Sequence, residues 1–173
     1  VRGRAQLADP DFCKKAEAGQ TDDIDYCIGC NQGCYDGFEN MDMECITCLR
    51  NPALGREKEC EIHLTEKPET VLVAGGGIAG LEAAIILKKR GHDPILCEAT
   101  DTLGGQFLTA GEAPRKKEMK AAAISMAKKA ERLGVDIRMN TKVTPEMIEL
   151  ITTSFTNLGY NANDIKIISH SES

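Results

Sequence analysis

The clearest succession of apolar and polar segments begins at Thr70. Thr70 to Ala74 is a short, β-branched apolar run, which is typical of a buried parallel strand. A helix is predicted from Ile78 to Lys89 with Gly91 at its end, and a second apolar strand from Pro94 to Cys97, closed by Glu98. A strand, a helix and a second strand in this order predict an α/β fold with a parallel sheet.

A further helix is predicted from Met119 to Leu133, because apolar residues recur there at helical spacing and Gly134 follows. Its apolar face is expected to carry Met119, Ile124, Ala127, Ala130 and Leu133. Val135 to Met139 is predicted to be a third strand.

One more helix is predicted near the start of the chain. Asp9 stands before Pro10, the arrangement of an N-cap followed by proline at the first helical position. The helix is expected to reach Ala16 or Ala18 and to stop at Gly19.

Composition narrows the class of protein. The 173 residues suffice for one or two small domains, and the net charge of -6 argues against non-specific binding of nucleic acid. No apolar run approaches the roughly 20 residues that span a bilayer. Eight cysteines without a secretory segment indicate a reducing, cytoplasmic location.

Five of the cysteines lie between Cys27 and Cys48, in the stretch C-I-G-C-N-Q-G-C-Y-D-G-F-E-N-M-D-M-E-C-I-T-C. A C-x-x-C-x-x-x-C run closed by a later cysteine is one way in which thiolates hold a 4Fe–4S cluster. Gly29 and Gly33 suit a tight bend that offers N–H groups to the cluster. Zinc is the alternative, because Cys27-x-x-Cys30 and Cys45-x-x-Cys48 have nearly the spacing of a zinc ribbon. Spacing alone leaves both open, and it leaves either Cys34 or Cys45 without a role.

The segment between the first strand and the first helix of the predicted sheet carries Gly75-x-Gly77-x-x-Gly80, with Glu98 about 20 residues later. The first glycine makes the turn, the second admits a pyrophosphate, and the third lets helix and strand pack. The helix N-terminus attracts phosphate, and Glu98 can accept hydrogen bonds from ribose hydroxyls. The residues predicted to contact a dinucleotide here are Gly75, Gly77, Ile78, Ala79, Gly80 and Glu98.

The string C-I-G-C-N-Q-G-C followed by C-L-R-N-P-A-L-G-R-E resembles the iron–sulfur segment of flavoenzymes related to 2,4-dienoyl-CoA reductase, enoate reductases and trimethylamine dehydrogenase. This resemblance covers about residues 1–150 and identifies the fourth ligand as the cysteine separated from Asn51-Pro52 by two residues. The implied ligands of a 4Fe–4S cluster are Cys27, Cys30, Cys34 and Cys48.

The resemblance also implies two flavin sites. Gly3-Arg4 matches the pair of residues that binds the phosphate of FMN at the end of the family's barrel. Leu103-Gly104-Gly105-Gln106 matches the loop over the flavin side of the FAD pyrophosphate. The further contacts nominated for FAD are Gly105, Gln106, Lys116 and, through its backbone, Val143.

The implied fold is α/β: the C-terminal end of a TIM barrel with an iron–sulfur loop, then a partial Rossmann-like FAD/NAD(P)-binding fold. The expected segments are 1–26 (end of the FMN barrel), 27–60 (cluster), 61–69 (linker), 70–150 (FAD/NAD(P)-binding fold) and 151–173 (a tail that the resemblance does not reach). We expect a fragment that is inactive alone, because the family's catalytic acids lie in the barrel.

In the resembled enzymes, electrons pass from NAD(P)H through FAD, a 4Fe–4S cluster and FMN to an enoate or enoyl thioester. The implied partners are therefore NAD(P)H and a small-molecule substrate, with no nucleic acid or membrane. An amine dehydrogenase-type relative is one alternative. A zinc-binding module fused to a nucleotide-binding fold and a degenerate structural remnant are others.

Overall fold

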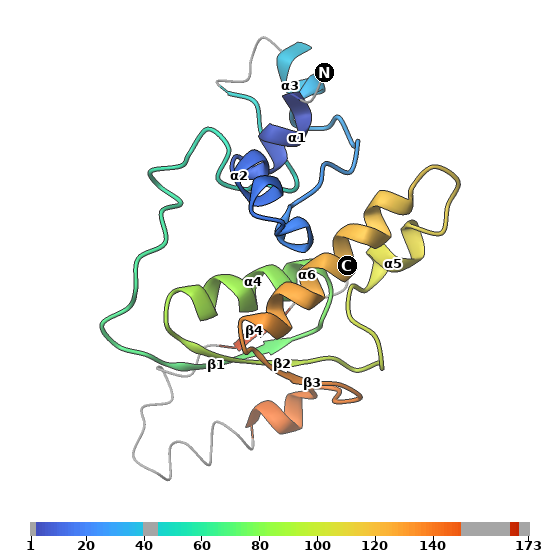
Figure 1. Cartoon of the computed structure of the whole chain (residues 1–173). Coiled ribbons are helices and arrows are strands. Elements are labelled where there is room, and N and C mark those ends of the chain that lie inside the picture. The colour runs from blue at the N-terminus through green and yellow to red at the C-terminus, as the bar shows by residue number, and fades with distance from the viewer. Residues whose placement is uncertain (1–2, 40–44, 150–166, 170–173) are drawn as a thin grey trace. The chain divides into compact units, whose positions relative to one another are not determined.

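A computed structural model of the chain (Figure 1) describes residues 3–39 and 45–149 and the backbone of 167–169. The chain forms two compact units. The cysteine unit comprises Val1–Glu61 and Thr109–Ser125, and the sheet unit comprises Ile62–Leu108 and Met126–Ser173. In the part of the chain that the structure describes, no helix is both long and apolar enough to cross a membrane.

The sheet unit contains a parallel sheet. The strands described are β1 (Thr70–Ala74), β2 (Asp93–Cys97), β3 (Asp136–Arg138) and β4 (Ile167–Ser169), in the order β3-β2-β1-β4. Every pairing between neighbours is parallel. The predicted α/β fold with a parallel sheet is thereby confirmed, and β4 adds a strand from the tail.

Helix α4 (Ile78–Lys89) connects β1 to β2. Both ends of β1 and of α4 agree with the prediction, β2 begins one residue earlier, and β3 is shorter than expected. The helix ends because Gly91, with φ of +85°, turns the chain back and donates its N–H to Lys88.

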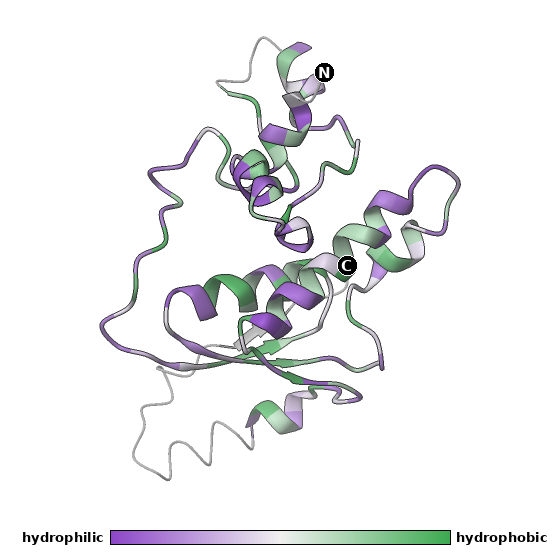
Figure 2. Ribbon diagram, in the orientation of Figure 1, coloured by the Kyte–Doolittle hydropathy of each residue, from purple (hydrophilic) through white to green (hydrophobic). Residues whose placement is uncertain are grey.

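The core of the sheet unit lies between the sheet and two helices, α4 and the part of α6 (Lys117–Arg132) that begins at Met126. Figure 2 shows hydrophobic colour along β1 and β2, in contrast to the polar chain that leads into β1. The buried residues of this hydrophobic core are Val73, Leu81, Ala84, Ile85, Leu96, Met126, Ala130 and Val135.

The buried face of α6 differs from the predicted one. Ala122, Met126 and Ala130 are buried, but Ile124 is 42% exposed, so its placement on the apolar face was wrong. At 3.6 residues per turn, Ile124 lies about 200° around the helix axis from Ala122. The small alanines face inward and the larger isoleucine faces outward, which a search for bulky apolar residues misses.

The cysteine unit begins with short helices: α1 (Gly3–Ala8), α2 (Phe12–Glu17) and the 3₁₀ turn η1 (Thr21–Asp23). Because α2 starts at Phe12 with Asp11 at the N-cap position, the prediction of Asp9 as N-cap was wrong. The predicted stop at Gly19 is confirmed, since this residue has φ of +72° beyond the last turn.

Asp9 instead holds the segment before the first cysteine. Asp9 is buried, with 2% of its surface exposed. Its carboxylate accepts hydrogen bonds from the backbone N–H of Asp11 (3.0 Å) and Asp25 (2.9 Å). Lys15 Nζ lies 2.6 Å from it. Burial raises the pKa of Asp9, but the hydrogen bond and charge of Lys15 together with the two N–H donors outweigh burial and lower the pKa overall.

We predict that Met126→Ala lowers the free energy of unfolding by about 2–5 kcal/mol, because it leaves a cavity in the core. The control is Ile124→Ala in the same helix, which should change it by less than about 0.5 kcal/mol, as exposed positions do. Urea unfolding followed by circular dichroism measures both. Equal losses would contradict the helix face seen here.

We also predict that Asp9→Asn destabilises the chain by about 1–3 kcal/mol at neutral pH, because Lys15 loses its buried carboxylate partner. A lowered pKa means that the stabilisation is present above the ordinary value of 3.8 and is lost as pH falls through the native pKa. The difference between parent and variant, measured by urea unfolding, should therefore shrink toward zero as the pH falls through the native pKa of Asp9.

The control for this prediction is Asp11→Asn, because the carboxylate of Asp11 forms an exposed ion pair with Lys14. Exposed pairs contribute roughly 0–1 kcal/mol. A difference for Asp9→Asn that stayed constant down to low pH would rule out the carboxylate as its source.

Candidate functional site

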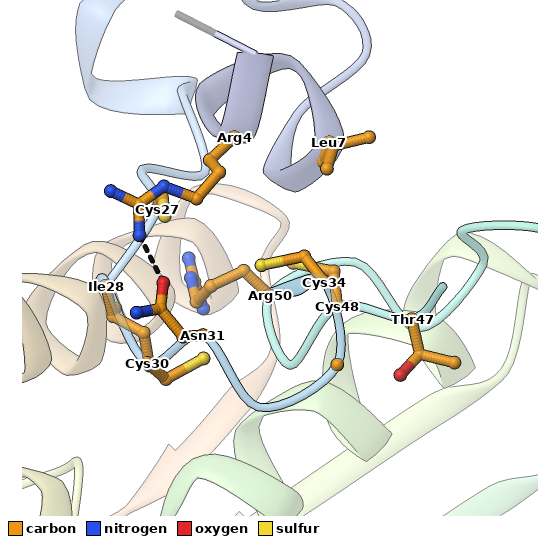
Figure 3. A pocket seen from close by; sticks show the side chains of 11 residues that line it. Arg4, Leu7, Cys27, Ile28, Cys30, Asn31, Cys34, Thr47, Cys48 and Arg50 are labelled. Atoms are coloured by element: carbon orange, nitrogen blue, oxygen red, sulfur yellow. Dashed lines mark hydrogen bonds between the residues drawn. The ribbon is translucent and has the colours of Figure 1, made fainter. Parts of the chain in front are cut away.

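Four of the five clustered cysteines line one pocket of the cysteine unit, seen from close by in Figure 3. They are the four that the resemblance implies as ligands: Cys27, Cys30, Cys34 and Cys48. All four are half-buried. The fifth, Cys45, is exposed and is not among the lining residues; its sulfur faces Gly55.

A close backbone approach brings the third and fourth cysteines of the pocket together. Thr47 donates its N–H to the carbonyl of Gly33 over 3.0 Å, and each of these residues directly precedes a cysteine of the pocket. A Cβ added at Gly33 would lie 2.3 Å from the hydroxyl of Thr47, so a side chain there would push apart the two backbone segments of the loop. Glycine at this position therefore has a packing reason.

The first part of the loop bends as the glycines predicted. Gly29 has φ of +66°, and its N–H points to the sulfur of Cys27 at 3.4 Å. Asn31 also has a positive φ, and its carbonyl accepts the N–H groups of Tyr35 and Asp36, which begin α3 (Tyr35–Glu39). The turn therefore reverses the chain between the second and third cysteines.

The donor set can be compared with zinc and with an iron–sulfur cluster. Among the described residues, no three His, Cys, Asp or Glu side chains converge on a point where one metal ion could sit. Structural zinc requires four ligands within about 2.3 Å of the same ion. In a 4Fe–4S cluster each thiolate binds a different iron, so the cysteines surround a volume instead. Four thiols around one pocket are an arrangement that a cluster could occupy.

Two arginines from distant parts of the sequence line the same pocket. Arg4, in α1, is exposed and donates a hydrogen bond to the side-chain oxygen of Asn31 (Figure 3). Arg50 Nη2 lies 2.7 Å from the Asp25 carboxylate. Gly3, the neighbour of Arg4, has open space where a Cβ would be. The structure thus joins the predicted phosphate-binding pair to the cysteine loop.

In the sheet unit, the predicted glycine loop follows β1 directly. Gly75 has φ of +101°, which L-residues with a side chain rarely adopt, and a Cβ at Gly80 would lie 1.9 Å from the Gly75 carbonyl oxygen. A Cβ at Gly77 would meet no atom of the described residues within 4 Å. These are the geometries expected of a turn, a helix–strand contact and an open approach for a ligand. Ile78 and Ala79 form the first turn of α4 above this opening.

Glu98 lies beside the same loop. Its Oε2 accepts the N–H of Gly76 at 2.6 Å, and its Oε1 accepts the N–H and hydroxyl of Thr100. Burial raises the pKa of Glu98, but hydrogen bonds from Thr100 and Gly76 outweigh it and lower the pKa overall. The carboxylate is therefore ionised at neutral pH.

The remaining predicted contacts divide into two groups. Gly105 belongs with the glycine loop, because Gly104 donates its N–H to the Gly76 carbonyl at 2.8 Å and Gln106 begins α5 (Gln106–Ala110) next to it. Val143 is half-buried in the segment after β3. Lys116 is exposed and belongs to the cysteine unit, whereas Glu98 belongs to the sheet unit.

Sequence reasoning missed Gly76. Its N–H holds Glu98, and a Cβ there would lie 2.5 Å from the Leu103 side chain, so it joins the two glycine-rich loops. The signal was the uninterrupted run of three glycines, in which only the first and last were used. Asp25 was also missed, because its partner Arg50 is 25 residues away in the sequence.

Comparison with known proteins places these features. Residues 70–158 match the family model described as FAD-dependent oxidoreductase, so the match continues beyond Leu150. The chain is 40% identical to a bilirubin reductase of Mediterraneibacter gnavus over 84% of this chain and 22% of that protein. It is 36% identical to an NADH oxidase of Thermoanaerobacter brockii over 94% of this chain and 25% of that protein.

Solved structures of similar enzymes also superpose on this chain. A 2-naphthoyl-CoA reductase superposes with a TM-score of 0.77 at 30% identity, over 85% of this chain and 22% of that one. A histamine dehydrogenase from Rhizobium sp. 4-9 superposes with a TM-score of 0.74 at 32% identity, over 84% of this chain and 22% of that one. The chain spans about a quarter or less of these proteins.

These relatives comprise reductases and an amine dehydrogenase, which confirms the resemblance that the motifs indicated. The family match covers strands β1, β2 and β3 of the parallel sheet, the glycine loop and Glu98. The chain belongs to the family of FAD-dependent oxidoreductases.

Proposed function

We propose that the chain is the electron-relay part of a flavin- and iron–sulfur-dependent oxidoreductase. The cysteine unit would hold a 4Fe–4S cluster and the sheet unit the adenine dinucleotide FAD. The observation that carries the proposal is the pocket lined by Cys27, Cys30, Cys34 and Cys48, from which Cys45 is absent. When bound, the cluster supplies one-electron transfer between two-electron flavins.

The chain's own residues account for binding and positioning at the cysteine pocket. The contact between Gly33 and Thr47 sets Cys34 beside Cys48, and the turn at Gly29 returns the chain between Cys27 and Cys30. The Gly29 N–H donates a hydrogen bond to the sulfur of Cys27. Hydrogen bonds to the ligand atoms of a metal centre influence its reduction potential.

The dinucleotide site is supported by the open position at Gly77 and the free N-terminus of α4. Glu98 has accepted hydrogen bonds from Gly76 and Thr100, and a carboxylate with about four lone-pair sites can accept more from ribose hydroxyls. As an ionised group it would repel a 2′-phosphate. The likeness to a Rossmann-like FAD fold rests on the β1–α4–β2 unit and the order of the strands.

An FMN phosphate is proposed at Gly3-Arg4. Guanidinium carries five N–H donors, and the structure gives Arg4 one partner among the described side chains, Asn31. The other donors can face a phosphate while this one holds the cysteine loop. This pair would form one edge of an FMN site at the end of a TIM barrel, as the resemblance implies.

For the complete reaction, we propose reduction of the double bond of an enoate or enoyl-CoA by NAD(P)H. Support comes from the similarity to reductases, one of which is a 2-naphthoyl-CoA reductase, and to an NADH oxidase. Oxidation of an amine is the second candidate, because the histamine dehydrogenase structure is as similar.

Reconstitution under anaerobic conditions tests the cluster. We predict about four irons and four acid-labile sulfides per chain, as one cubane with four thiolates requires. Serine at Cys27, Cys30, Cys34 or Cys48 should greatly lower both counts. The matched controls are Cys45→Ser, in the same stretch, and Cys13→Ser, which should retain them.

Two results would contradict this assignment. Stoichiometric zinc without sulfide would replace the relay by a zinc-binding module. Loss of iron in Cys45→Ser with retention in Cys48→Ser would reassign the fourth ligand.

Two glycine variants test the dinucleotide site. Gly77→Ala places a methyl group in open space, so we predict unchanged stability but at least about tenfold weaker binding of ADP, or about 1.4 kcal/mol. Gly80→Ala forces a Cβ onto the Gly75 carbonyl and should lower stability instead. Calorimetry and urea unfolding separate the effects; ADP affinity equal to the parent in Gly77→Ala would remove the phosphate site.

A further inference from the structure

Arg50 places a buried positive charge among the four cysteines. Its side chain is 7% exposed, and it lines the same pocket as the sulfurs (Figure 3). An arginine two residues after Cys48 could equally have faced water, as the exposed Arg56 does. Since guanidinium stays protonated in proteins, the charge is permanent.

Asp25 forms an ion pair with Arg50 and so orients this charge. Its carboxylate lies 2.7 Å from Arg50 Nη2 and is 21% exposed. The backbone of Asp25 is itself fixed, because its N–H donates to the buried carboxylate of Asp9 at 2.9 Å. Arg50 is therefore oriented by a chain of contacts that begins between α1 and α2.

A buried ion pair is weak support for folding stability, since desolvation offsets much of the attraction. Its position next to a redox group has a more direct consequence. Accepting one electron makes a cluster one charge more negative, and a nearby unscreened cation favours that state. A carboxylate at the same place opposes it.

We propose that Arg50 and Asp25 form an opposed pair that sets the reduction potential of the cluster, Arg50 raising it and Asp25 limiting the rise. This inference rests on the proposed 4Fe–4S function. It assigns Arg50 as a positioning and tuning residue and Asp25 as its counter-charge, with neither one a ligand.

The test uses the full 173-residue chain, reconstituted with iron and sulfide and titrated with dithionite as the electron donor. The reduced fraction is followed by electron paramagnetic resonance. In Arg50→Gln we expect reduction to become about tenfold less favourable, a shift of about 59 mV to more negative potential for one electron. In Arg50→Lys, which keeps the charge, the potential should stay close to that of the parent.

Asp25→Asn should shift the potential in the opposite direction, to a more positive value. The opposite signs distinguish tuning from a structural defect, which would shift both variants the same way or neither. The matched controls are Arg56→Gln and Asp22→Asn, which make the same changes of net charge at exposed positions. Their effects should be small and should vanish at high salt, whereas those of the buried pair should persist.

Each outcome decides the inference. A parent chain that takes up no iron and sulfide overturns the proposed function and this inference with it. If Arg50→Gln and Asp25→Asn both bind the cluster and have the same reduction potential as the parent, the tuning inference is overturned but the proposed function is not. If Arg50→Gln fails to load, a positive shift in Asp25→Asn supports the proposal, and an unchanged or negative one overturns it. Loss of the cluster from both variants would make the pair structural and overturn it too.

Discussion

The approach of Thr47 to Gly33 is the constraint on which the cysteine pocket depends. It joins two arms of a loop that are fourteen residues apart, each immediately before a cysteine, through a backbone hydrogen bond of 3.0 Å. No side chain fits between them at Gly33. Spacing in the sequence can bring Cys27, Cys30 and Cys34 to one turn, and this contact helps to bring Cys48 to them, while Cys45 stays outside the pocket.

The sheet unit uses the same device. Gly80 lets α4 approach the Gly75 carbonyl, and Gly76 lets the two glycine-rich loops meet beside Glu98. In both units two backbone segments approach closely where a glycine carries no side chain, and the candidate site lies beside that approach. Local packing and the chemistry of each site therefore have one cause.

The sequence predicted the elements whose signal is local. The β-branched run of β1 and the glycine punctuation of α4 identified both to the residue. Contacts between distant residues could not be found in this way: Asp9 has the sequence of an N-cap, but the N–H of Asp25 and the ammonium of Lys15 occupy its carboxylate. The prediction that Ile124 lies on the buried face of α6 was wrong for another reason: alanines fill that narrow face. The four pocket cysteines were anticipated by resemblance, since spacing alone allowed zinc.

The two arginines of the pocket act on its charge in different ways. Among the described side chains, Arg4 has the neutral amide of Asn31 as its partner, and its exposure lets water and salt screen its charge. Arg50 is partly neutralised by Asp25, but burial preserves what remains. Four cysteines that bind a cluster as thiolates would repel one another, and a chain with a net charge of -6 would add to that repulsion. A paired, buried arginine can offset it without the full desolvation penalty of a lone ion, which is the physical reason for placing Asp25 opposite Arg50.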